Sequence, residues 1–418
     1  MKMKKIFGII FVVIAMCGFT ACSSEDFTES IFDTSIAKVD TTSTTAPFDQ
    51  WLYDNFVLPY NTEIQYKFNL NASDMGYQLA PADYGKSQLL AHFIKYLFYD
   101  VYTKFGGKDF MKRYGPRIFH FIGSKSYSAS TGTETLGYAS SGVKITLINV
   151  NGIKGIDENT QYTPEDVDAL NEMQFHTMHH EFSHILHQTK SYPVIFGQIT
   201  PSTYDARNWN ERDSVDSHTM GYVTQYGSSA IYEDFVETLS CTITENDCRW
   251  MMRIIDACMN GGVKETDKDD INKLIDSLEI EGVDDPSKPW NNFKIYREEV
   301  YDELTGTWSF TGRFVPSFHT ADSKRLGAQN STESKTFRYK VLADQQPKSF
   351  RDYLNNWVQV SATAEIAGIN AIMKKLDIAT KWYTENYGLY LYRIRHEVRE
   401  RQNNINEYIK TITIYDNK

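Results

Sequence analysis

Two histidines four residues apart, with a glutamate beside the first, form the group in this sequence that is best suited to chemistry. They are His180, Glu181 and His184, which together read His-Glu-x-x-His. On a helix, residues four apart lie on one face about 5–6 Å from each other, so both imidazoles could bind one metal ion. Glu181 would then lie beside that ion and could accept a proton from a water molecule there. The spacing therefore predicts a zinc (Zn²⁺) site with Glu181 as the general base of a hydrolysis.

The helix that this site requires is indicated by the residues around the motif. Thr163 and Pro164, followed by two acidic residues, are typical of a helix start, and Val167–Gln188 contains neither Pro nor Gly. Apolar side chains flank the motif and could bury the other face: Phe175, Met178, Phe182, Ile185 and Leu186. The alternative is a helix whose histidines merely lie on a polar face. The helical context favours the metal site.

A catalytic zinc site needs a third protein ligand and one open position. One common arrangement places another His six residues after His184, but Lys190 occupies that position. That arrangement is therefore excluded. His187 and His176 lie near the same helix face, and we expect them around the site or at its rim rather than on the ion.

A better source of the third ligand lies downstream. Residues 231–259 form another predicted helix, which carries Glu233 and Glu237. One helical turn separates these two carboxylates, so both could face the same site. Spacing alone leaves the third ligand as Glu233 or Glu237.

The two segments together resemble a known family. His-Glu-Phe-Ser-His-Ile-Leu-His, followed roughly 50 residues later by a Tyr and then by Glu-Asp-Phe-Val-Glu, is similar to the zinc-binding metallopeptidase lipoproteins associated with substrate import. More distantly it resembles gluzincins of the lethal-factor type. The resemblance, strongest over residues 165–245, implies that Glu233 is the third zinc ligand and that Tyr226 stabilises the oxyanion of the transition state. It leaves Glu237 as a rival ligand whose expected role is to orient a ligand histidine.

The N-terminus has the character of a processed leader. Residues 1–21 read as a signal peptide, with a basic start and an apolar run, Ile6–Ala15, that is shorter than the roughly 20 residues of a membrane span. The run ends in a segment that resembles a lipoprotein box, so Cys22 would carry the lipid and anchor the chain without spanning the membrane. The acidic tetrapeptide at 23–26 resembles a surface-export tag. We therefore expect an outer-membrane lipoprotein exposed on the cell surface.

The composition and charge of the chain limit the classes of partner that we expect. The formal net charge is −11, with 41% hydrophobic and 23% charged residues, which is typical of a globular protein. No basic stripe stands out, so we expect no nucleic-acid partner. Three cysteines remain in the body, Cys241, Cys248 and Cys258, and an odd number predicts no complete disulfide framework. The resemblance implies a peptide or glycoprotein substrate, and a TonB-dependent transporter with its surface lipoprotein as partners.

The pattern of helices and strands predicts an α+β fold. We expect a zincin-like fold, with a mixed sheet over the active-site helix and a C-terminal helical region containing a strand-rich insertion. The predicted parts are a signal peptide (1–21), a flexible tether (22–47), a catalytic domain (48–262), the strand-rich insertion (263–345) and a C-terminal helical region packing on the catalytic domain (346–418).

Two functions follow from these expectations. In the first, an extended peptide adds to the edge of the sheet, which we expect at Val143–Val150, and a surface peptidase cleaves it at the zinc. In the second, the chain is a substrate-capturing lipoprotein partner of a transporter, and its zinc site is structural or vestigial. Glu181 favours the first function, because a purely structural site needs no base.

Overall fold

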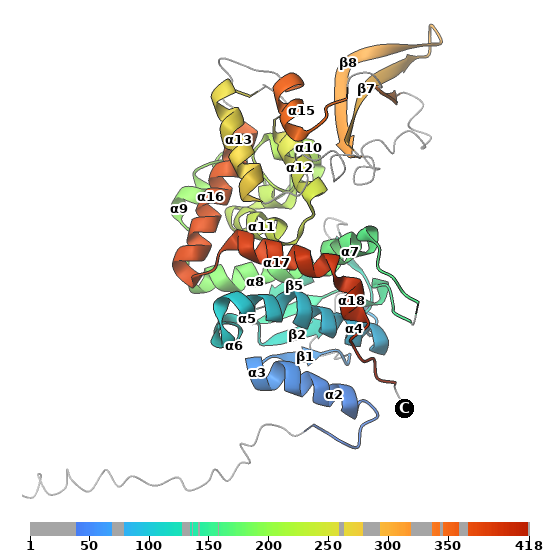
Figure 1. Ribbon diagram of the computed structural model, residues 1–418, viewed down its shortest axis with the longest axis vertical. Helices are drawn as coiled ribbons and strands as arrows, with labels where there is room; N and C mark the ends of the chain where they lie inside the picture. Colours follow the sequence, from blue (N-terminus) through green and yellow to red (C-terminus); the bar gives the residue numbers. More distant parts are fainter. Residues whose placement is uncertain are drawn as a thin grey trace, which may run out of the picture.

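The computed structural model describes residues 39–68, 79–127, 134–135, 137–140, 143–157, 159–258, 263–278, 293–318, 337–342, 346–358 and 367–416. The predicted signal peptide and most of the predicted tether lie outside these residues, so the lipid anchor at Cys22 stays a prediction. Helices and both parallel and antiparallel strands make up the fold (Figure 1), which confirms the predicted α+β class.

A four-stranded mixed sheet lies in the N-terminal half. Its strands run in the order β1 (Glu63–Gln65), β2 (Ile118–Phe121), β6 (Lys144–Leu147) and β5 (Gly137–Ser140). The pairs β1–β2 and β2–β6 are parallel, and β5 is antiparallel to β6. The predicted edge strand was wrong, because β6 lies inside the sheet and β5 forms its edge. β5 runs antiparallel to β6 and is the outermost strand on that side of the sheet.

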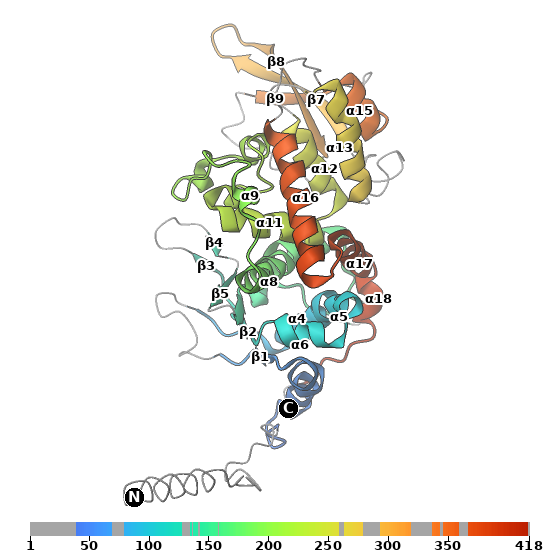
Figure 2. The same cartoon turned by 90° about the vertical axis from the view of Figure 1, so that its left-hand side faces the viewer.

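Long helical segments pack beside this sheet (Figure 2). They are α2 (Ala46–Leu52), η1 (Tyr53–Val57), α3 (Leu58–Tyr60), α4 (Tyr84–Ile94), η3 (Lys95–Tyr99), α5 (Asp100–Gly106) and α6 (Lys108–Tyr114). The Phe98 ring joins the layers, because its centroid lies 6.2 Å from that of Phe119 on β2 and 5.0 Å from that of Phe182 on α8 (His176–Thr189). Large buried rings therefore fix the distance between the sheet and the predicted active-site helix.

The predicted helix start at Thr163 is confirmed. The Thr163 side chain accepts a hydrogen bond from the Asp166 N–H, and the Asp166 side chain accepts one from the Thr163 N–H, which is a capping box. The helical path then runs without interruption through α7 (Pro164–Leu170), the π-helical η5 (Asn171–Phe175) and α8 (His176–Thr189). A capped start thus leads into the segment that carries the histidines.

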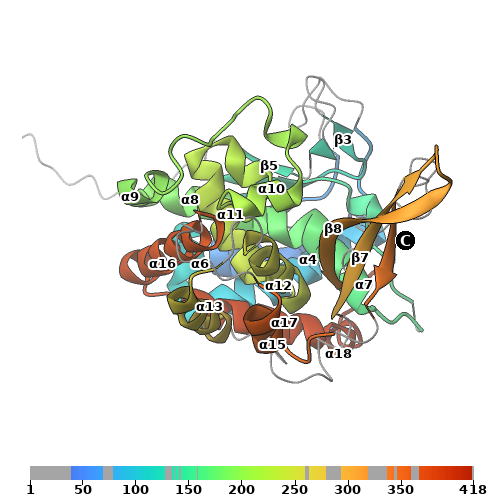
Figure 3. The same ribbon diagram turned by 90° about the horizontal axis from the view of Figure 1, so that it is seen from above.

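The helix predicted over 231–259 is two helices, α11 (Ile231–Thr244) and α12 (Asp247–Ala257). Asn246 begins the second one, since its side chain accepts a hydrogen bond from the Arg249 N–H, and this N-cap competes with helix continuation. Figure 3 shows α11 near the centre of the molecule, where it packs against α8, α16 (Ala367–Tyr387) and α17 (Leu391–Asn403). The predicted C-terminal helices therefore surround the helix that carries Glu233.

A separate three-stranded antiparallel sheet lies at the far end of the molecule from the first sheet (Figure 1). Its order is β8 (Thr307–Phe318), β7 (Phe293–Asp302) and β9 (Phe337–Val341). The predicted strand-rich region begins differently, because Glu265–Ser277 forms the helix α13. The remaining elements are β3 (Ser126–Tyr127), β4 (Glu134–Thr135), η4 (Val150–Gly152), α9 (Val194–Gly197), η6 (Trp209–Glu211), α10 (Ser214–Thr219), η7 (Tyr226–Ser229), α15 (Phe350–Asn356) and α18 (Ile405–Ile409).

The three cysteines of the body are free thiols, and Cys241 and Cys258 are buried. Every helix in the described part of the chain is too short or too polar to cross a bilayer.

Candidate metal centre

Helix α8 presents three histidines on one face. His176, His180 and His184 follow one another at intervals of four residues, which stacks their rings along the helix. The ring centroids lie 6.0 Å apart in the first pair and 4.8 Å apart in the second. Buried apolar residues hold the helix in the core: Met178, Phe182, Ile185 and Leu186. The local spacing alone therefore brings the two predicted ligand imidazoles together.

Glu233 on α11 completes a triangle with these imidazoles. The Nε2 atoms of His180 and His184 lie 3.1 Å apart, and Glu233 Oε2 lies 3.1 Å from the first and 3.2 Å from the second. A tetrahedral ion with ligands at about 2.0–2.2 Å separates its ligand atoms by about 3.3–3.6 Å. Two imidazole nitrogens and a carboxylate oxygen are also a donor set that zinc prefers. The group therefore fits a zinc ion, and all three side chains keep a small exposed fraction.

Glu237, the rival ligand, lies on the other side of His180. Its Oε1 is 2.6 Å from His180 Nδ1 and 2.8 Å from His176 Nε2, and its Oε2 accepts a hydrogen bond of 2.6 Å from Thr224 Oγ1. Because a carboxylate only accepts, His180 Nδ1 donates to Glu237, and Nε2 is the ring nitrogen that faces Glu233 and is placed to meet a cation. Glu237 thus occupies the position of an orienting residue rather than a place in the triangle.

His187 supports the second imidazole in the same way. Its Nε2 lies 2.9 Å from His184 Nδ1. Burial, and then the neighbouring His184, lower the pKa of His187 to about 4, so His187 is neutral and can accept the proton of His184 Nδ1. Each of the two imidazoles therefore has its outer nitrogen engaged and its inner nitrogen turned towards Glu233.

The electrostatics of the triangle favour a positive charge. Burial alone would lower the pKa of His180, but the carboxylates of Glu233 and Glu237 outweigh it and raise that pKa to about 10. Burial would raise the pKa of Glu233, but hydrogen bonds from His180 and His184 lower it to about 2. The carboxylates are thus ionised in a buried place, which is a setting that a divalent cation satisfies.

Tyr226 and Glu181 lie beside the triangle. The Tyr226 ring is 5.8 Å from the His180 ring and 5.0 Å from the Trp209 ring, and 37% of the residue is exposed. Burial, and then the charge of Glu233, raise the pKa of Tyr226, so its phenol keeps the proton. Glu181 is buried on α8 directly after His180, and its negative charge adds to the rise in the pKa of both His180 and Tyr226. The structure therefore brings all five predicted site residues together.

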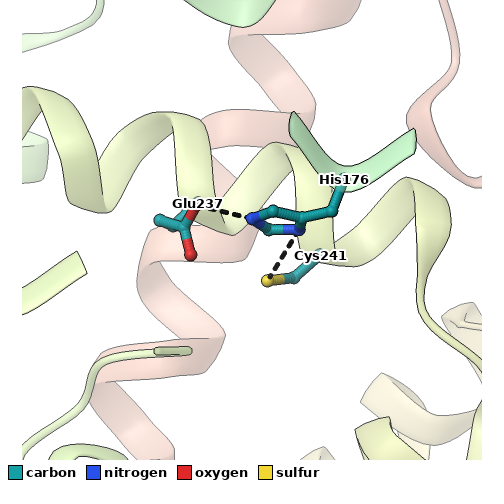
Figure 4. Close-up of side chains that lie close together, drawn as sticks. All are labelled: His176, Glu237 and Cys241. Carbon is teal, nitrogen blue, oxygen red and sulfur yellow. Dashed lines mark hydrogen bonds and ion pairs between the residues drawn. The ribbon is translucent and has the colours of Figure 1, made fainter. Parts of the chain in front are cut away.

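A second group of potential ligands adjoins the first. Figure 4 shows the His176 ring between Glu237 and Cys241: one ring nitrogen faces the carboxylate, and Nδ1 lies 3.9 Å from Cys241 Sγ. The ring itself thus occupies the space between the other two donors. Arg253 Nη2 lies 3.7 Å from the sulfur, and burial raises the pKa of the Cys241 thiol. A protonated thiol beside a guanidinium is unsuited to a cation, so this group supports Glu237.

Several residues at the site could not be predicted from the sequence. Thr224 holds Glu237, Trp209 packs on Tyr226, and Lys375 forms a buried ion pair of 2.7 Å with Asp234, the neighbour of Glu233. Each contact joins segments whose relation depends on tertiary packing. A threonine, a tryptophan and a lysine at these spacings match no local motif, so the sequence held no signal for them.

The fold and the site together define a metallopeptidase, with a mixed sheet beside a helix that carries two closely spaced histidines and a glutamate. The comparison with protein families shows which family of metallopeptidases the chain belongs to. The sequence model of the family described as "Putative zinc-binding metallo-peptidase" matches residues 41–277, more than half of the chain, and the chain belongs to this family.

A solved structure from Bacteroides caccae, described in the same words, has a similar fold. It is 21% identical in sequence, the alignment covers 93% of this chain and 100% of that chain, and the TM-score is 0.51. No curated protein matches the chain.

Proposed function

We propose that the chain is a zinc-dependent peptidase of the gluzincin type, with the metal held by His180, His184 and Glu233. One observation carries the proposal: the two Nε2 atoms and Glu233 Oε2 meet within 3.1–3.2 Å, beside Glu181. Membership of a family described as zinc-binding supports the choice of metal.

The residues around the triangle suit peptide hydrolysis. Zinc would supply Lewis acidity, which lowers the pKa of a water molecule and polarises a carbonyl. Glu181 would take the proton of the attacking water and pass it to the leaving amine. Tyr226 would donate a hydrogen bond from its phenol as negative charge develops on the carbonyl oxygen. Glu237 and His187 would keep the imidazoles in their tautomers throughout.

The sheet edge supports a peptide as the substrate. β5 pairs with β6 on one side and is the last strand of its sheet, and it also packs against α8. The backbone of such an edge can accept one more extended strand. A peptide added there would run near the helix that carries His180 and His184.

Removal of zinc is the direct test. We expect the mature chain to contain one zinc ion and to cleave members of a broad peptide library. Dialysis against a chelator should lower the rate at least about 100-fold, and one equivalent of zinc should restore it, because both the nucleophile and the polarised carbonyl depend on the ion. Mass spectrometry of the digests and elemental analysis measure both quantities. Cleavage that persists in the metal-free chain would refute the proposal.

Tyr226→Phe tests the proposed oxyanion donor. We expect kcat to fall about 10²–10³-fold with little change in KM, because the phenol is needed only when charge develops on the carbonyl oxygen. Steady-state kinetics on one library peptide would measure both constants. Tyr390→Phe, a substitution at a 55% exposed tyrosine away from the site, is the matched control. Equal kcat values for both variants would remove Tyr226 from the mechanism.

The predicted leader bears on where in the cell this peptidase would act. A lipid on Cys22 would hold it at the outer-membrane surface, where it could trim peptides or glycoproteins before import by a TonB-dependent transporter. Fatty-acid labelling that is lost in Cys22→Ser would support the anchor, and labelling that persists would refute it.

A further inference from the structure

Lys375, in the C-terminal part of the chain, is buried against α11, the helix that carries Glu233. Lys375 on α16 is 1% exposed, and its Nζ lies 2.7 Å from Oδ2 of Asp234, which is fully buried. Lys375 lies outside residues 41–277, to which the family model extends. A buried ion pair is costly to desolvate and seldom adds net stability, so its placement calls for a role other than stability.

Asp234 lies in the first turn of α11, next to Glu233. This turn begins at Ala230, which provides no side-chain cap, and uncapped helix ends fray. Asp234 fastens the turn instead, because its Oδ2 accepts hydrogen bonds from Lys375 Nζ and from the Tyr204 hydroxyl, each at 2.7 Å. The backbone that carries Glu233 is therefore held through its neighbour.

The same ammonium group also holds the segment that leads to Tyr226. Lys375 Nζ donates a hydrogen bond of 2.8 Å to the Gly221 carbonyl and lies 4.0 Å from the centre of the Tyr222 ring, a cation–π contact. A few residues further on, Thr224 binds Glu237. One side chain thus connects the helix of the proposed zinc ligand with the segment of the proposed oxyanion donor.

Helix α16 packs against this segment with almost no space between the backbones. A methyl group added at Gly221 would lie 2.4 Å from Ala371 Cβ, and one added at Gly368 would lie 2.7 Å from the carbonyl oxygens of His218 and Thr219. Gly221 also has a φ of +93°, which favours glycine. The position of α16 therefore determines the position of residues 218–222.

From these contacts we propose that Lys375 is a positioning residue of the metal centre. It fixes Glu233 relative to Tyr226 by holding Asp234 and Gly221 at one point. The inference rests on the proposed function, because it takes Glu233 as a zinc ligand. It makes the C-terminal helix α16 a part of the peptidase site rather than an appended domain.

The test separates positioning from folding with two variants. Lys375→Met alone leaves a buried, unpaired carboxylate and should lower both Tm and zinc affinity. The double variant Lys375→Met/Asp234→Asn removes that charge, so most of the Tm should return. Zinc affinity should nevertheless stay about 10–100-fold weaker, the range seen when a supporting residue of a metal ligand is lost, and kcat should fall with KM nearly unchanged. Competition with a chromophoric chelator measures the affinity without substrate.

Lys381→Met is the matched control, because it breaks a Lys–Asp pair on the same helix whose side chains are 65% and 58% exposed. It should change none of these quantities. Tyr204→Phe removes one of the two hydrogen bonds to Asp234 Oδ2, along with a long one of 3.4 Å that Tyr204 accepts from Thr200 Oγ1, and leaves the Lys375 ion pair in place. It decides the question if the methionine variants do not fold: we expect zinc affinity to weaken several-fold in a folded protein.

Each outcome has one meaning. A double variant that regains wild-type zinc affinity and kcat together with its Tm would overturn the inference, and so would a folded Tyr204→Phe variant with unchanged affinity. If the wild-type chain itself binds no zinc, the proposed function fails instead.

Discussion

Glu181→Gln is expected to lower kcat about 10²–10⁴-fold while the chain keeps one zinc ion, which is the loss typical of a missing general base. Gln has the size and shape of Glu but accepts no proton. The triangle of ligand atoms is formed by His180, His184 and Glu233, so the substitution leaves the proposed donor set intact. Steady-state kinetics on a library peptide, with elemental analysis of the same sample, measures both quantities.

The matched control is Glu172→Gln, in the helical turn before α8, where the Glu172 side chain is 57% exposed and pairs with Arg249 at 3.4 Å. Its activity should stay within about twofold of wild type, because exposed pairs contribute little. A zinc-loaded Glu181→Gln chain that cleaves at the wild-type rate would show that Glu181 is no base. A zinc-loaded wild type that cleaves nothing would instead favour the substrate-capturing function.

The two ligand histidines could be predicted because their relation is local. Four residues on a helix fix the separation of His180 and His184 whatever surrounds them, and the capping box at Thr163 marks where that helical segment starts. The choice between Glu233 and Glu237 is not local. Both face α8, and only the crossing of α11 over α8 decides that one meets the Nε2 atoms and the other meets an Nδ1 atom.

Other features depended on contacts that no periodicity encodes. The order of strands is set by pairing, so an apolar, alternating segment such as β6 reads the same at the edge of a sheet as inside it. Lys375 reads as an exposed helix residue, yet it donates to a carbonyl 154 residues earlier in the chain. The helix break at Asn246 did have a local signal, because Asn followed by Asp is a common N-cap and first turn.

Glu233→Ala is expected to abolish stoichiometric zinc binding, whereas Glu237→Gln is expected to keep one zinc ion bound. If an apparent binding energy of about 10–16 kcal/mol is shared among the three ligands, the loss of one costs about 3–5 kcal/mol, or roughly two to four orders of magnitude in affinity. The loss of a residue that orients a ligand costs about 10–100-fold. Chelator competition on the purified chains resolves these ranges.

The opposite ranking would exchange the roles of the two carboxylates and would require α11 to turn relative to α8. Such a turn has a physical obstacle. Glu237 Oε1 and Oε2 together already accept hydrogen bonds from His176, His180 and Thr224, and all three would have to break before the carboxylate could reach an ion between the Nε2 atoms. Within the described part of the chain, Glu233 meets only the two imidazoles there and the phenol of Tyr226. A cation would therefore replace contacts at Glu233 with stronger ones, but at Glu237 it would dismantle the support of its own ligand.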